Sequence, residues 1–165
     1  MPKKETVECA KEAKHEGKAP STQAGEFIRE EIENIREGKH GAKSAKQAIA
    51  IGLSKARRAG VDLKPPKKGT VSEKTRKSAL SAYEKGQKHE PIDPVRSRAG
   101  VQALKKESTQ SASHTALSRQ THSAAKKRTA KERSEAAQKA VKTKGPEGLS
   151  EAATKAARTR ARNKK

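Results

Sequence analysis

The chain has 165 residues and a formal net charge of +21, and only 30% of it is hydrophobic and 1% aromatic, against 36% charged. So little apolar material excludes a large hydrophobic core, because apolar burial is what offsets the conformational entropy lost on folding. The one cysteine excludes an intramolecular disulfide, and no apolar run or leader of the required length is present, so we expect a cytoplasmic protein without a transmembrane segment.

The N-terminal part of the chain predicts an arm and then a helix. Residues 1–20 mix Lys and Glu closely, and we expect a frayed helix or a flexible, disordered arm. Residues 21–37 predict a helix that buries Ile28, Ile32 and Ile35 on one side. Its other side carries an acidic stripe, which is either a solvated face or a binding surface for a basic partner or for the protein's own basic end. The stripe consists of Glu26, Glu30, Glu33 and Glu37.

Residues 44–60 combine a start signal, an apolar period and a stop signal. Ser44 and Gln47 form a predicted capping box, and Gly60 supplies a left-handed ending, so the helix covers residues 45–59. Gly52 costs about 1 kcal/mol of helix propensity relative to Ala. Its place on the apolar side therefore predicts that another backbone packs closely against it. That side contains Ala45, Ala48, Ile49, Gly52, Leu53, Ala56 and Ala59.

This region also carries a resemblance. The run Lys39-His40-Gly41, followed by KQAIAIGLS and an Ala-Arg-Arg-Ala-Gly ending, resembles a family of small basic bacterial proteins of unknown function. The resemblance covers residues 37–66. It implies a bacterial origin and a helical core module, and it implies no catalytic residue.

The middle of the chain predicts the end of a small domain. Residues 61–70 are rich in Pro and Lys and suit an extended arm that follows phosphates. Ser72 is predicted to cap a third helix, which completes a helical domain at residues 21–90. Residues 91–122 have the composition of a linker with one short helix.

Residues 123–165 are rich in Lys, Arg and Ala and contain an internal repeat. SEAAQKAVKTK at 134–144 and SEAATKAARTR at 150–160 match with an offset of 16 residues. Each repeat predicts a short helix with little to pack against, and such helices are marginal alone. We therefore expect an all-α fold, with a helical hairpin or three helices followed by a long, largely disordered or marginally helical basic tail. The tail is similar in composition to the basic tails of linker histones and bacterial histone-like proteins.

The charge predicts a polyanionic partner. We expect non-sequence-specific binding of nucleic acid in the bacterial nucleoid, with DNA as the first ligand and RNA or the ribosome as the alternative. Lysine and arginine displace the counterions condensed on phosphates, which requires no base readout. The predicted nucleic-acid-binding residues are Lys43, Lys46, Lys55, Arg57, Arg58, Lys67, Lys68, Lys126, Lys127, Arg128, Lys131, Arg133, Lys139, Lys142, Lys144, Lys155, Arg158, Arg160 and Arg162.

Other classes of function are less well supported by the sequence. A hydrophilic stress-protective protein would share this composition but would be nearer to charge balance. A protein-partner module would use the acidic stripe or the side of the helix that carries Ile49 and Leu53. An enzyme is least expected, because no Gly-rich phosphate loop, metal-ligand cluster or nucleophile with a base is present. We predict no catalytic residue, cofactor or metal.

Overall fold

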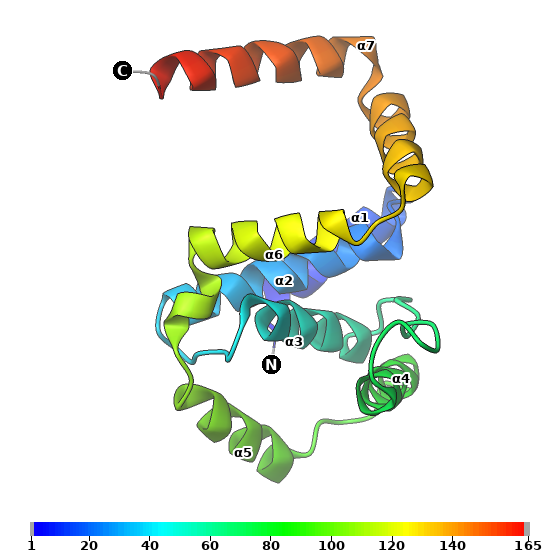
Figure 1. Cartoon of the computed structure of the whole chain (residues 1–165). Helices are drawn as coiled ribbons and strands as arrows, with labels where there is room; N and C mark the ends of the chain where they lie inside the picture. The colour runs from blue at the N-terminus through cyan, green and yellow to red at the C-terminus, as the bar shows by residue number, and fades with distance from the viewer. Residues whose placement is uncertain (1, 164–165) are drawn as a thin grey trace. The chain divides into compact units, whose positions relative to one another are not determined.

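The computed structural model describes residues 2–163, which form helices and turns without a β-strand (Figure 1). The chain divides into two compact units, Met1–Gln120 and Thr121–Lys165. The helices are α1 (Lys4–His15), α2 (Pro20–Arg36), α3 (Ala45–Arg58), α4 (Glu73–Gln87), α5 (Pro94–Lys105), the 3₁₀ helix η1 (Thr109–Ala112), α6 (His114–Lys126) and α7 (Ala130–Arg162). The predicted all-α class is confirmed.

The Ser44 cap and the glycine ending of α3 form as predicted, whereas the Gln47 half of the capping box does not. The Ser44 side chain accepts a hydrogen bond from the Gln47 amide at 3.2 Å. The Gln47 side chain reaches back one residue further than expected and accepts from the Lys43 amide at 2.7 Å. Gly60, with φ of +87°, turns the chain out of the helix in the left-handed conformation that glycine adopts without a Cβ clash.

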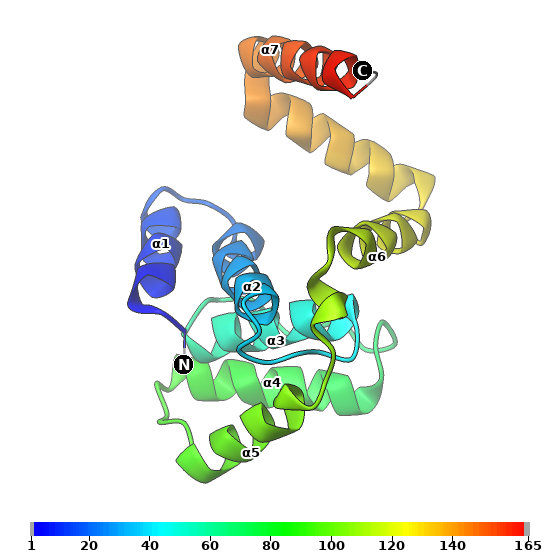
Figure 2. The ribbon, with the colours of Figure 1, turned by 90° about the vertical axis from the view of Figure 1, so that its left-hand side faces the viewer.

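Helix α3 lies at the centre of the first unit, where it packs against α2 on one side and α4 on another (Figure 2). A Cβ atom added to Gly52 would lie 2.7 Å from Ile28 Cα and 3.0 Å from Ile28 N, so the backbones of α2 and α3 nearly touch. The predicted close packing at Gly52 is confirmed. The contact with α4 is closer still, because a Cβ on Gly86 would clash with the Arg57 carbonyl.

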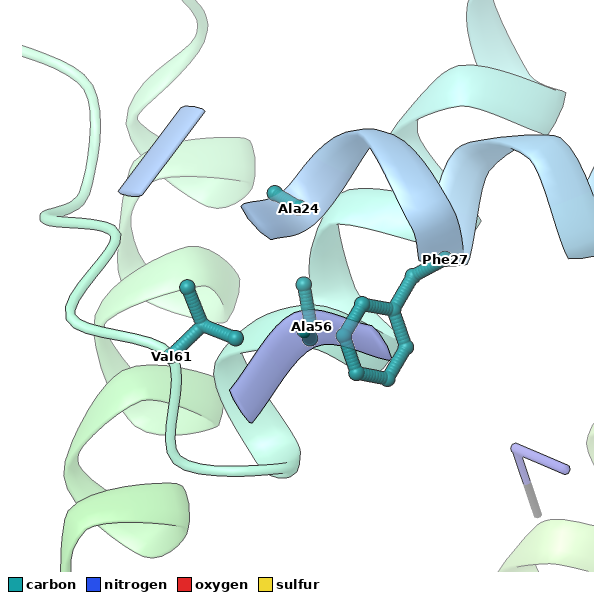
Figure 3. Packing of buried hydrophobic residues seen from close by; sticks show 5 residues of the cluster. Ala24, Phe27, Ala56 and Val61 are labelled. Atoms are coloured by element: carbon teal, nitrogen blue, oxygen red, sulfur yellow. The ribbon is translucent and has the colours of Figure 1, made fainter. Parts of the chain in front are cut away.

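The hydrophobic core consists of two small clusters in the first unit. One surrounds Phe27, the largest fully buried side chain, and also contains Ala10, Ala24, Ala56 and Val61 (Figure 3). The other contains Ile35, Ala42, Ala48 and Ala112. Most of these side chains are alanine, so close approach of the helices, rather than side-chain bulk, excludes water from the core.

Two segments outside the predicted domain are part of this unit. Residues 4–15, expected to form a frayed helix or a flexible arm, form α1, which packs on α2 and buries Ala10 and Ala13. Residues 104–112, expected to belong to a linker, pack on the turn between α2 and α3. The Gly41 amide donates to the Leu104 carbonyl at 2.9 Å, and the Arg36 side chain donates to the Ala112 carbonyl at 2.9 Å.

The prediction of a largely disordered or marginally helical basic tail is wrong, since α6 and α7 cover nearly all of the residues from 114 to 162. Local interactions explain the order of α7. Thr129 and Glu132 form a full capping box, in which Thr129 Oγ1 accepts from the Glu132 amide and the Glu132 carboxylate accepts from the Thr129 amide. The interior is mostly Ala, Lys, Arg and Glu, which are strong helix formers. On each side of a kink at Gly145, the helical segment also extends beyond its repeat, which reduces the penalty for short length.

The contact at Gly52 makes a stability prediction. We expect Gly52→Ala to lower the free energy of unfolding by about 1–3 kcal/mol, because the added methyl group has to push α2 away from α3. Gly25→Ala in α2 is the matched control, since a Cβ there meets nothing within 4 Å. That variant should be neutral or more stable by up to about 1 kcal/mol. Urea unfolding followed by circular dichroism measures both, and equal stability of the two variants would contradict the packing described above.

Candidate nucleic-acid interface

Most of the basic side chains of α3 that were predicted to contact phosphates have partners within the protein instead. The Arg57 side chain is buried, with 7% of its surface exposed. Its Nε donates to the Leu63 carbonyl at 2.9 Å and a terminal nitrogen donates to the Lys64 carbonyl at 3.4 Å. Burial lowers the pKa of the Arg57 guanidinium from its ordinary value. Arg57 therefore holds the chain that leaves α3 and is not available to a phosphate.

Lys55 forms an ion pair with a buried glutamate. Its Nζ lies 2.5 Å from Glu31 Oε2, and the Glu31 side chain is fully buried between α2 and α3. The other carboxylate oxygen, Oε1, lies 3.4 Å from His40 Nε2 and has no hydrogen-bond partner among the described residues. His40 Nδ1 in turn donates to the Gly41 carbonyl at 3.1 Å. These side chains connect α2, α3 and the turn between them.

The burial of Glu31 was not predicted from the sequence, because the isoleucines of α2 were expected on its buried side and the glutamates on its exposed side. The signal was present, because Glu31 follows Phe27 by four residues and precedes Ile35 by four, which places it in the middle of an apolar stripe. Both of those neighbours are fully buried.

The remaining predicted residues of the first unit do not form one patch. Arg58 donates to the carbonyls of Glu90 and Pro91, both at 3.2 Å. Four lysines stay exposed, two of them beside the start of α3 and two in the segment that follows its end. The first pair flanks the start of the 14-residue helix and the second follows its end, and the helix itself is about 21 Å long. The four residues are Lys43, Lys46, Lys67 and Lys68.

The acidic stripe is not a continuous open face. Glu30 is buried, and its two carboxylate oxygens share the single hydrogen of the Lys3 amide, each at 3.2 Å from the nitrogen. Glu26 pairs with Arg29 at 2.6 Å. Glu37 pairs with Lys39, and the hydrogen bond from Lys39 lowers the pKa of the Glu37 carboxyl. The structure thus gives partners inside the first unit to three of the four glutamates.

The second unit is different, because the basic side chains of α7 have no partner among the described residues. Every Lys and Arg in α7 is exposed, and none makes a side-chain hydrogen bond or ion pair within the part of the chain that the structure describes. Glu135 and Lys139, and likewise Glu151 and Lys155, are four residues apart in the helix and form no ion pair there either. These basic residues are Lys131, Arg133, Lys139, Lys142, Lys144, Lys155, Arg158, Arg160 and Arg162.

Three further predicted residues lie just before α7. Lys126, Lys127 and Arg128 are exposed at the end of α6 and in the turn that follows it. The capping box formed by Thr129 and Glu132 follows this segment directly. Hydrogen bonds from the Thr129 amide and hydroxyl lower the pKa of the Glu132 carboxyl, so it stays charged at the positive end of the helix dipole.

Comparison with known proteins gives a family likeness without an activity. Residues 11–69 match a family of unknown function (DUF6496). The match covers α2 and α3 and ends before α4. No curated protein and no solved structure matches the chain.

The described residues offer neither a metal site nor a membrane span. Within residues 2–163, no group of three or more His, Cys, Asp or Glu side chains has an arrangement that could hold a metal ion. None of the helices described there has both the length and the apolar character needed to cross a bilayer.

The two kinds of basic residue in α3 can be separated by mutation. We expect Arg57→Gln to lower the free energy of unfolding by about 1–3 kcal/mol, because the carbonyls of Leu63 and Lys64 lose a buried charged donor. Lys46→Gln removes the same charge from an exposed position and should change stability by less than about 0.5 kcal/mol. Urea unfolding provides the measurement. If Arg57→Gln leaves the free energy of unfolding unchanged, this arginine does not hold the end of α3.

Proposed function

We propose that the protein binds nucleic acid without sequence specificity, through the phosphate backbone, and that α7 is its principal interface. The strongest support comes from the exposure of the basic residues in α7 and from their lack of partners among the described residues. All nine are exposed and unpaired among the described residues, against four glutamates in the same helix. Cations without an internal partner give up no interaction within the protein when they bind a phosphate.

The physical mechanism is counterion release. A nucleic-acid duplex carries about one negative charge per 1.7 Å of its axis and a condensed layer of counterions, which bound Lys and Arg side chains displace. The affinity of such a protein falls steeply with salt and depends little on sequence. Because α7 is already helical, its cations are held in a regular array and less ordering is needed on binding.

Duplex DNA is the ligand that we place first, which corresponds to a protein of the bacterial nucleoid. Structured RNA presents the same phosphates and is the alternative. Comparing the affinities for duplex DNA and duplex RNA distinguishes the two ligands. Contacts to phosphates alone predict similar salt slopes for both, so a higher affinity for one duplex must come from its shape.

The location of the interface is testable with two charge-matched variants of the full chain. The first changes Lys155, Arg158 and Arg162 of α7 to Gln, and the second changes three exposed lysines of α4 to Gln, namely Lys74, Lys77 and Lys85. Binding to random-sequence duplex DNA is measured over a salt series. We expect the α7 variant to lose about 3 from the slope of log affinity against log salt, and the α4 variant to lose less.

Each result has a clear meaning. Equal losses in the two variants would show that net charge, and not α7, determines binding. If the unmodified chain does not bind duplex DNA at low salt, the proposal for DNA is wrong, and a duplex RNA probe is then tested by the same series.

A further inference from the structure

Helix α7 is built from two equivalent arms. The sequence repeat places Ser134 and Ser150 at matching positions, 16 residues apart. The structure repeats a side-chain contact with the same offset, because Thr143 Oγ1 donates to the Lys139 carbonyl at 2.8 Å and Thr159 Oγ1 donates to the Lys155 carbonyl at 3.0 Å. We call residues 130–144 the first arm and residues 146–162 the second arm.

Each arm carries a basic stripe along one side. At about 100° per residue, the three cations of the first stripe fall within about 80° of the helix circumference, and those of the second within about 60°. All are exposed. The first stripe consists of Lys131, Lys139 and Lys142, and the second of Lys155, Arg158 and Arg162.

In a straight helix the two stripes would point in opposite directions. An offset of 16 residues corresponds to four full turns plus about 160°. One straight duplex lying along such a helix would therefore meet one stripe, and the other stripe would face solvent.

The structure is not straight at this point. Gly145 has φ of 67° and ψ of 176°, which is outside the helical region, and Pro146 follows it without an amide hydrogen to continue the helix (Figure 1). A Cβ on Gly145 would meet nothing within 4 Å, so the glycine is needed for the backbone conformation and not for packing. Because of the kink, the two stripes are not fixed on opposite sides of one straight helix axis.

We propose that the kink at Gly145 and Pro146 makes α7 a bivalent clasp, in which both basic stripes bind one nucleic-acid duplex at the same time. This inference rests on the proposed function and specifies how the interface works. The arms are about 22 Å and 25 Å long, so each follows about seven base pairs. Joining two weak contacts in one chain raises the affinity without any new contact, because the second arm binds at a high effective concentration.

The test removes the kink and keeps every charge. The full-length variant Gly145→Ala/Pro146→Ala replaces both residues with the strongest helix former, and circular dichroism checks that its helix content is equal to or greater than that of the parent. Two probes are used: a random-sequence duplex of about 30 base pairs, which both arms can reach, and a hairpin duplex of about 8 base pairs, about 27 Å long, which has room for one arm.

We expect a difference that depends on the probe. On the long duplex the variant should bind at least about 10-fold more weakly than the parent, and its salt slope should fall by about 3, the contribution of one stripe. On the short hairpin the two proteins should bind alike. Gly148→Ala is the control, because this glycine lies in the second arm, its Cβ would meet Lys144 Cβ at an ordinary 3.4 Å, and the kink is retained. It should behave as the parent on both probes.

The outcomes separate this inference from the proposed function. If the straightened variant equals or exceeds the parent on the long duplex, or weakens equally on both probes, the bivalent clasp is wrong while nucleic-acid binding stands. If the parent itself binds neither probe at low salt, the proposed function fails first. A loss with Gly148→Ala equal to that of the straightened variant would also overturn the role of the kink.

Discussion

The close approach of α2 and α3 at Gly52 is the constraint on which the first unit depends. Its two core clusters are mostly alanine, with Phe27 and Ile35 as the only large apolar side chains that are fully buried among the described residues. Side chains this small exclude water only when the helix backbones come close together. Glycine allows that approach at Gly52 against α2 and again at Gly86 against α3.

This packing determines what the polar residues of α3 do. A helix with close neighbours on two sides has little free surface left, so the side chains at the edges of its contacts need partners inside the protein. Lys55 pairs with the buried Glu31, and Arg57 donates to backbone carbonyls beyond the end of the helix. Cations that look like a phosphate-binding face in the sequence therefore stabilise the fold.

Helix α7 shows the opposite arrangement. No residue of α7 is buried, and its order comes from a capping box and from strong helix formers rather than from a core. Its cations consequently have no partner inside the described part of the protein and are left for an external anion. The overall charge thus includes cations with a structural role, such as Lys55 and Arg57, and the unpaired cations of α7, and a count of Lys and Arg does not distinguish the two.

What the sequence determined by itself was local. The caps at Ser44 and Ser72, the left-handed ending at Gly60 and the 16-residue repeat depend on neighbours a few positions away, and they could be predicted. The order of α7 was also encoded locally, in its cap and its composition, although its lack of packing partners pointed to a disordered tail. Only the tertiary structure decided that Glu31 and Arg57 are buried and that residues 104–112 pack on the α2–α3 turn. Those contacts join residues far apart in the chain, and a side chain's partner across such a distance is determined by how the helices pack.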